Sequence, residues 1–183
     1  LFNDDGSLII ERSTISNNGA TSGNGGGIFN SSGSTLVTFS TIAKNGASGN
    51  GGGIYNNTGS ISLINSIVAN SPSGNDCFGS VVAVDSLDSD SSCQNATTSA
   101  SINLGPLQDN GGETRTHALL PGSVAIDALT LPSTNLLDQR GIARPQGAKF
   151  DIGAYEVECE SFPVDVTTEN ELNRSIGCYN SAP

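Results

Sequence analysis

Short apolar runs recur along the chain from Leu1 to about Asn70, separated by glycine- and asparagine-rich turns. The segment Gly-Gly-Gly-Ile-Phe-Asn at residues 25–30 returns as Gly-Gly-Gly-Ile-Tyr-Asn at residues 51–56, and runs rich in β-branched residues occupy 7–10 and 35–38. Such runs favour strands. A repeat of about 25 residues marks a solenoid in which each copy forms one coil. The pattern therefore predicts an all-β protein built as a parallel β-helix.

Stacked coils place the equivalent residues of successive repeats one above another. A buried asparagine needs a polar partner, and in a stack the next coil supplies one. The aligned repeats predict an asparagine ladder, an aliphatic ladder and a stacked pair of Phe29 and Tyr55. The predicted asparagine ladder is Asn18, Asn45 and Asn70, and the predicted aliphatic ladder is Ile15, Ile42 and Ile67.

The phase of the repeat carries a further expectation. When the first copy is aligned with the second, positions 1–3 fall on positions 28–30, so the sequence opens part-way round a coil. A coil with unpaired strand edges invites association. We expect upstream residues, another repeat or another chain to stack on this end.

The organisation changes along the chain. We assign residues 1–157 to β-helix coils, with a distinct terminal region from about residue 103, where proline and turn residues become frequent. Residues 158–183 read as a cap-like strand and short helix that begins another β-helix unit. The helix is expected at about 169–180, because Thr168 begins a capping box and an apolar stripe follows it.

Composition and charge narrow the classes of partner. The chain has 18 acidic residues against 7 lysines and arginines, a formal net charge of −11. Strong acidity argues against nucleic acid and anionic membrane surfaces as partners. No segment approaches the roughly 20 apolar residues of a membrane span, so we expect no membrane insertion in this segment.

Four cysteines bear on the compartment. They do not follow the CxxC spacings of zinc or redox sites. Pairing each cysteine with its neighbour is the simplest of three connectivities, and four buried free thiols in a cytosolic protein are the alternative. Disulfides imply an oxidising setting outside the cytoplasm, which predicts an extracellular or cell-surface protein. The cysteines are Cys77, Cys93, Cys159 and Cys178.

Two acidic groups are candidates for chemistry. The first is either a calcium site or acid/base pair acting on a polysaccharide, or a set of buried ion pairs with arginines forked onto carboxylates. We favour the ion pairs because interleaved arginines repel a cation. The second lacks the ordered spacing of a calcium loop, so we favour a solvated loop and no cofactor, with Ca²⁺ as the alternative. The first group is Asp127, Asp138, Arg140, Arg144, Asp151 and Glu156, and the second is Asp85, Asp88 and Asp90.

His117 is the only histidine. No nucleophile elbow accompanies it, so a packed or hydrogen-bonded histidine in a turn is expected. Asn-X-Ser/Thr sequons are common in a chain of this composition, and their modification depends on the host. They begin at Asn30, Asn56, Asn95 and Asn173.

Ordered motifs in the second half carry a family resemblance. Leu-Gly-Pro-Leu-Gln-Asp-Asn-Gly-Gly at 104–112 is followed by Thr-His-Ala-Leu-Leu-Pro-Gly-Ser at 116–123, Asp-Gln-Arg-Gly at 138–141 and Asp-Ile-Gly-Ala-Tyr-Glu at 151–156. With the repeats, these motifs resemble bacterial right-handed parallel β-helix proteins that carry a choice-of-anchor Q domain.

The resemblance covers residues 1–157 and implies a right-handed, secreted or surface-anchored β-helix, usually a module of a very large protein, with no known catalytic activity. It also implies a cysteine pair at Cys77 and Cys93. Residues 158–183 are similar to the N-terminal cap of such β-helices.

Three functions are open. The favoured one is a non-enzymatic extracellular structural protein, a repeat unit or subunit of a surface filament built end to end from copies of itself, as tandem repeats or as a homopolymer. An adhesin or carbohydrate-binding module that contacts surface glycans is the alternative. A polysaccharide lyase or hydrolase is less favoured, because fold alone does not confer activity and 7 cationic side chains equip the chain poorly for polyanions.

Overall fold

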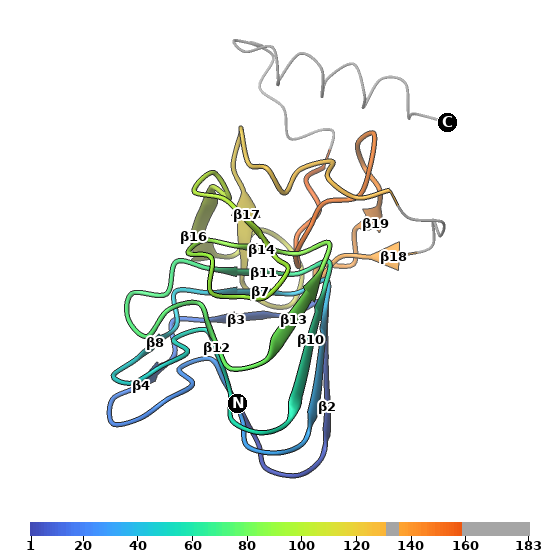
Figure 1. The fold of residues 1–183 in the computed structure, drawn as a ribbon. Helices are drawn as coiled ribbons and strands as arrows, with labels where there is room; N and C mark the ends of the chain where they lie inside the picture. Colours follow the sequence, from blue (N-terminus) through green and yellow to red (C-terminus); the bar gives the residue numbers. More distant parts are fainter. Residues whose placement is uncertain (131–135, 159–183) are drawn as a thin grey trace.

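The structure, a computed structural model, describes residues 1–130 and 136–158 (Figure 1). It is all-β, and no helix occurs among these residues. The predicted helix at 169–180 lies outside the described residues. Within the described part there is also no helix that could span a membrane.

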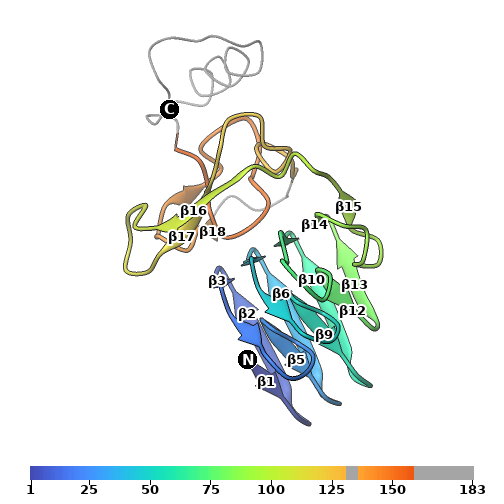
Figure 2. The same cartoon turned by 90° about the vertical axis from the view of Figure 1, so that its left-hand side faces the viewer.

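Three parallel sheets make up the first half of the chain, and the chain visits them in turn (Figures 1 and 2). The first holds β1 (Phe2–Asn3), β5 (Ile28–Asn30), β9 (Ile54–Asn56) and β12 (Cys77–Phe78). The second holds β2 (Ser7–Glu11), β6 (Ser34–Thr38), β10 (Ser60–Ile64) and β13 (Val81–Val84). The third holds β3 (Thr14–Ser16), β7 (Thr41–Ala43), β11 (Ile67–Ala69), β14 (Leu87–Asp88) and β15 (Thr97–Thr98). The short strands β4 (Gly19–Ala20) and β8 (Gly46–Ala47) also pair in parallel. We call residues 1–98 the coil stack.

The register between successive coils follows the sequence repeat closely at first. Phe2 pairs with Phe29 and Asn3 with Asn30, which is the predicted alignment of residues 1–3. The separation between equivalent residues is 27 between the first two coils and 26 between the next two, and it shortens to 20 at Ser66 and Ser86. The coils therefore become smaller along the stack.

The register corrects the third member of each predicted ladder. Ile15 pairs with Ile42, but the residue above Ile42 is Val68, and Ile67 pairs with Thr41. Matching isoleucine to isoleucine in the sequence aligns Ile67 with Ile42. The backbone pairing instead joins Ile42 to the next residue along the chain, Val68. Because Val is also β-branched, it fills the inward position that isoleucine holds in the coils below. A one-residue slip turns a side chain to the other face of a sheet.

The same slip displaces Asn70. It occupies the position of Asn17 and Lys44, all three with left-handed backbone at φ of 59°, 58° and 57°. Asn70 is exposed, whereas Asn45 is fully buried and accepts a hydrogen bond at Oδ1 from Asn18 Nδ2 at 2.9 Å. The asparagine pair 18–45 is therefore present, and Asn70 does not extend it.

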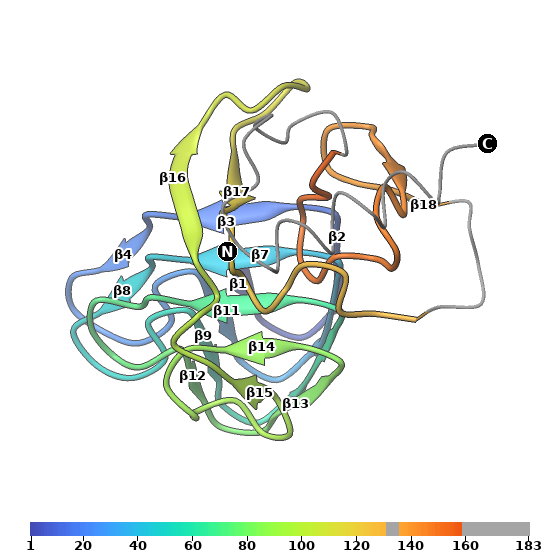
Figure 3. The same ribbon diagram turned by 90° about the horizontal axis from the view of Figure 1, so that it is seen from above.

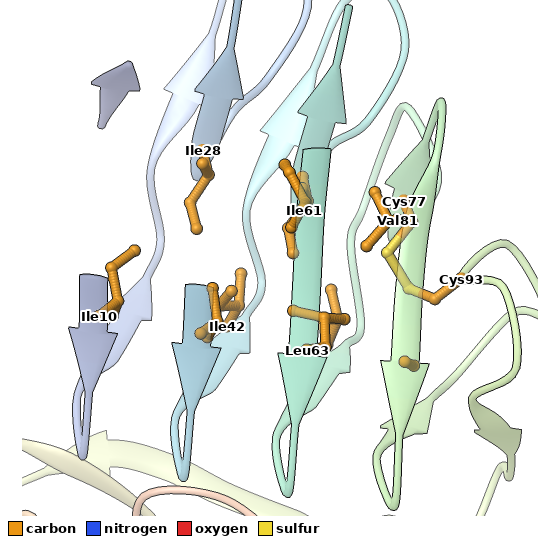
Figure 4. Close-up of a cluster of buried hydrophobic side chains, with 12 residues drawn as sticks. Ile10, Ile28, Ile42, Ile61, Leu63, Cys77, Val81 and Cys93 are labelled. Atoms are coloured by element: carbon orange, nitrogen blue, oxygen red, sulfur yellow. A yellow bond between two sulfur atoms is a disulfide. The ribbon is translucent and has the colours of Figure 1, made fainter. Parts of the chain in front are cut away.

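Alternation within strands fills the inside of the coil stack. In β10, Ile61 and Leu63 point inward while Ser60 and Ser62 are exposed. Inward residues from all three sheets form one apolar column, with fully buried Ile28, Ile42 and Val81 among its members (Figure 4). Burying a side chain of this size contributes about 1.5–3 kcal/mol, so the column is the main source of stability for the coils.

Residues 103–158 are built differently, and we call them the flanking region. β16 (Leu104–Gln108) pairs antiparallel with β17 (Thr116–Leu119), and β18 (Leu136–Leu137) pairs antiparallel with β19 (Ala143–Arg144). Parallel pairing ends at β15, so the coils end near residue 98 and do not continue to 157 as expected. The change of character expected near residue 103 falls where this antiparallel region begins.

The flanking region packs on the outer face of the third sheet (Figure 3). Ile67, Ala69 and Leu87 form a second apolar core with residues such as Leu119 and Phe150. Hydrogen bonds add to the contact, among them one from Gly153 N to Asn65 O at 2.9 Å and one from Ala154 N to Thr41 Oγ1 at 3.0 Å. Gly153 has a φ of 98°, and a Cβ there would lie 2.8 Å from Ile67 and 2.9 Å from Thr41, so the close approach requires glycine.

Candidate functional site at the open edge of the coil stack

One end of the coil stack presents unpaired strands. β1, β2 and β3 are the outermost strands of the three parallel sheets. Apolar side chains at this end are exposed: Leu1 by 61%, Phe2 by 68% and Ile9 by 60%. Unpaired backbone groups of an edge strand are a template for another strand. We call the outer sides of β1, β2 and β3 the open edge.

An aromatic ladder reaches the open edge. Phe2, Phe29, Tyr55 and Phe78 stack in order, with ring centroids 5.4, 5.0 and 5.2 Å apart. Each such pair contributes about 0.5–1.5 kcal/mol beyond its buried area. Phe29 and Tyr55 were expected to stack, and the structure adds a ring at each end. Phe2 is the end ring at the open edge, and its outer face has no aromatic neighbour among the described residues.

A buried asparagine ladder runs beside the aromatic one. Asn3 Nδ2 donates to Asn30 Oδ1 at 2.8 Å, Asn30 Nδ2 donates to Asn56 Oδ1 at 2.9 Å, and Asn56 Nδ2 donates to Ser80 O at 2.7 Å. All donors point away from the open edge. The acceptor Asn3 Oδ1 therefore faces the open end, where it accepts a 3.3 Å hydrogen bond from Gly6 N. Sequence reasoning missed this ladder, although its signal was the final residue of the Gly-Gly-Gly-Ile-aromatic-Asn motif.

The opposite end of the coil stack is covered by its own chain. Gln94 bridges to β13, donating from its N to Val81 O at 3.0 Å and accepting from Ala83 N at 2.8 Å. A disulfide joins Cys77 of β12 to Cys93, as the predicted neighbour pairing requires. Cys159 and Cys178 lie outside the described residues. We call residues 89–98 the closing segment.

Carboxylates in the acidic loop hold the closing segment. Asp88 is fully buried, and its two oxygens accept from Cys93 N at 2.9 Å and Thr98 Oγ1 at 2.7 Å. Asp90 accepts from Asp76 N at 2.9 Å. Asp85 is exposed. Among residues 1–130 and 136–158, no group of three or more His, Cys, Asp or Glu side chains is placed to hold a metal ion. Of the three predicted aspartates, two therefore act as hydrogen-bond acceptors for the turn.

Asp76 belongs to the same network and was missed by sequence reasoning. It is fully buried and accepts from Ser89 N at 2.9 Å and Ser89 Oγ at 2.6 Å. Burial raises the pKa of its carboxyl, while the bonds from Ser89 oppose that rise. Its position beside a cysteine gave no sequence signal for this role.

The predicted charged cluster is assembled in the flanking region. Arg144 Nη1 lies 3.1 Å from Glu156 Oε2, and the same guanidinium donates to Asp151 O and Gly153 O at 2.7 Å each. Arg140 forms a 2.8 Å ion pair with Asp138. These guanidiniums therefore tie separate turns together.

Asp127 meets the cluster through the backbone. Its N donates to Asp151 Oδ1 at 2.7 Å, and its own Oδ1 accepts from Lys149 N at 3.0 Å. All six predicted residues are thus in one network, and their neighbours include main-chain groups that no sequence pattern specifies.

Burial governs the electrostatics of the cluster. Burial, followed by the charge of Asp151, raises the pKa of Glu156 to about 7, against the opposing effect of Arg144. Side-chain exposure is 0% for Arg144, 1% for Glu156 and 3% for Arg140. A polysaccharide has no access to groups this deeply buried. The arrangement suits a structural lock and does not suit acid/base catalysis on a polymer.

Comparison of the chain with protein-family models, with curated proteins and with solved structures finds no match. Functional inference therefore rests on the residues of this chain. The open edge is the surface with the most specific geometry, because strand edges, an aromatic face and an amide acceptor all end there.

Proposed function

We propose that the protein is an extracellular structural unit whose assembly involves no catalysis: a right-handed parallel β-helix that joins end to end with others to form a surface filament. The observation that carries the proposal is the open edge. There Phe2 is the last ring of the aromatic ladder and Asn3 the last amide of the asparagine ladder, and the strands have no partner on their outer sides.

Several features support a right-handed β-helix. Three parallel sheets receive one strand each from successive turns of the chain, and like residues stack between turns. Crossover connections between parallel strands of one sheet are right-handed in about 98% of cases. The motifs similar to choice-of-anchor Q proteins favour the same fold.

A further coil of the same kind is the occupant that the open edge fits. Such a coil would bring a strand to β1, an aromatic ring to the free face of Phe2, and an asparagine amide to Asn3 Oδ1. The chain's own Gly-Gly-Gly-Ile-aromatic-Asn motif combines these elements. The coil belongs either to the same polypeptide or to a second copy. Residues 158–183, predicted from sequence as a β-helix cap, are the segment that we propose to cover the open edge.

The setting outside the cytoplasm is proposed on two grounds. An intramolecular disulfide persists in oxidising compartments, and a net charge of −11 favours solubility at an exposed surface. The cell surface is therefore the proposed location.

A carbohydrate-binding role is the second candidate, and one groove favours it. An open groove of about 520 Å³ lies beside β4 and β8. Its wall carries the amides and hydroxyls of Asn17, Asn18, Thr21, Ser48 and Ser73. Side chains of these types suit the hydroxyl groups of a glycan.

Sedimentation and electron microscopy across a concentration series test the filament. We expect the wild-type chain to form end-to-end rods, and the double variant Phe2→Lys/Ile9→Lys, which charges the open edge, to stay monomeric. The control Ser60→Lys/Ser62→Lys charges exposed positions on β10, which lies at neither end of its sheet, and should still assemble. Deleting residues 158–183 should also abolish assembly. A wild-type chain that remains monodisperse at every concentration, or a deletion with unchanged fibres, contradicts the proposal.

A further inference from the structure

A serine and a histidine that are 101 residues apart in sequence meet between the coil stack and the flanking region. Ser16 Oγ on β3 lies 2.8 Å from His117 Nε2 on β17. On the other side of the ring, Nδ1 lies 2.7 Å from Gly105 O in β16. His117 is 1% exposed and Ser16 is partly exposed.

These contacts fix the tautomer of the histidine. A backbone carbonyl only accepts hydrogen bonds, so Nδ1 must carry the proton that it shares with Gly105 O. In the neutral ring Nε2 then has a free lone pair, and the Ser16 hydroxyl donates to it. Burial, aided by the charge of Lys44, lowers the pKa of His117 and keeps the ring neutral near pH 7. An activated nucleophile consists of a hydroxyl, a base that accepts its proton and a group that orients the base. Ser16, His117 and Gly105 O are arranged in this way.

Stacking does not require a serine at this position. The residue paired with Ser16 in the next coil is Ala43, and Ala69 pairs with Ala43 in the coil after that. Alanine therefore occupies this position in the next two coils. Serine occupies it in the coil where its hydroxyl contacts His117. The repeat alone could not reveal this, because His117 lies in a different part of the sequence.

A surface groove lies close to the pair. Asn17 and Asn18 directly follow Ser16 and line the groove of about 520 Å³ beside β4 and β8, whereas Ser16 and His117 are not part of its wall. Lys44, whose charge acts on His117, lies on the wall of the same groove. The asparagine, threonine and serine side chains of the groove suit the hydroxyl groups of an alcohol, and we place the ester of that alcohol at Ser16.

We propose that Ser16 is a nucleophile that accepts an acyl group from an ester of a hydroxyl-rich alcohol, such as an acylated sugar, with His117 as the general base. Ser16 Oγ bonds to the ester carbonyl carbon while His117 Nε2 takes the hydroxyl proton. The ester C–O bond breaks, and His117 passes the proton to the departing alcohol. Water then attacks the acyl-serine, with its proton taken by His117 and returned to Ser16, and a carboxylic acid leaves. This activity goes beyond the structural role and would recur once in each unit.

The reaction of the full chain with p-nitrophenyl acetate tests the proposal. We expect release of p-nitrophenol and an acetyl group on Ser16 in the peptide mass spectrum. Ser16→Ala, which matches the alanines of its column, and His117→Asn, which keeps a donor for Gly105 O, should lower the rate by about 10²–10⁴-fold. The control Ser62→Ala removes an exposed hydroxyl on β10 and should leave the rate unchanged.

The pH profile and a sugar ester complete the test. The rate should rise with pH through a midpoint below the ordinary histidine pKa, because the base must be neutral. An acetylated neutral oligosaccharide should show saturable acetate release that Thr21→Trp, which fills the groove, abolishes while p-nitrophenyl acetate still reacts. Equal rates in wild type and Ser16→Ala, or acetyl groups spread evenly over other hydroxyls, overturn the nucleophile. Unchanged sugar-ester turnover in Thr21→Trp overturns the substrate class.

Discussion

The coil stack and the flanking region hold their chains together by different means. In the coil stack, stability comes from the same residue type stacked on itself, as in the rings of Phe29 and Tyr55 or the amides of Asn30 and Asn56. In the flanking region it comes from unlike groups with unique partners, such as Arg144 between Glu156 and two carbonyls.

This difference teaches where each region is vulnerable. A stacked ladder distributes its energy over equivalent rungs, so one lost rung leaves the others in place. A buried ion pair concentrates its energy, because removing one partner leaves the other charge buried without compensation. Substitutions in the flanking region should therefore cost more, one for one, than substitutions in the ladders.

Arg144→Ala should have the largest effect. It leaves the Glu156 carboxylate and two carbonyls without their donor in a site with no exposure, which costs about 3–5 kcal/mol of unfolding free energy. Urea unfolding followed by circular dichroism measures the loss. The control Arg115→Ala removes an exposed arginine of the same region and should change stability by about 0.5 kcal/mol or less. Equal effects of the two variants would contradict the structural role of the cluster.

Removal of the disulfide should come next. Cys77 and Cys93 are 16 residues apart, and a loop of this size contributes about 3 kcal/mol by restricting the unfolded chain. The variant Cys77→Ala/Cys93→Ala should lose this amount in urea unfolding. Its closing segment should also show faster amide exchange at Gln94 than wild type, and unchanged exchange there would show that other contacts hold the segment.

Asn30→Ala tests the middle rung of the buried asparagine ladder. The substitution removes the bond from Asn3 Nδ2 and the bond to Asn56 Oδ1, for a cost of about 1–3 kcal/mol. Asn57→Ala, at the neighbouring exposed position, serves as the control. A loss as large as that of Arg144→Ala would remove the contrast between the two regions.

The last expected effect is a dependence on pH. The folded-state pKa of Glu156 is raised from 4.5 to about 7. A carboxyl with a raised pKa binds its proton more tightly in the folded state, so the contribution of Glu156 to stability is fully present below pH 4.5 and is lost as pH rises through about 7. Thermal unfolding of wild type should show this decline, and Glu156→Gln should flatten it. A wild-type stability that increases over the same interval would reverse the assigned sign.

Much of the coil stack could be predicted from sequence because the same residue types make the same contacts in successive coils. Alignment of the first two repeats placed Phe2 on Phe29, and the β-branched runs are strands. The prediction failed where coil length changed by one residue. It placed Ile67 above Ile42, whereas the structure places Val68 there. Hydrogen bonding of the backbone decides that register, and two adjacent β-branched residues give no sequence signal to choose between them.

The flanking region could be predicted only in part. The charged residues were identified, and the structure assembles them in one buried network, but sequence could not give their main-chain partners or show that the region lies against the side of the coils. The Ser16–His117 pair escaped prediction for the same reason. Contacts between unlike residues far apart in sequence leave no periodic trace.

The position of the flanking region has a mechanical consequence. Hydrogen bonds between coils run along the axis of the stack. A pull along that axis would therefore break the bonds between one pair of coils after another. The flanking region touches β3 through Ser16, β7 through Thr41 and β11 through Ile67. It therefore lies across successive coils as a splint, and tension must break its contacts before neighbouring coils can separate. Under load, a rod of such units would resist stretching through two parallel paths.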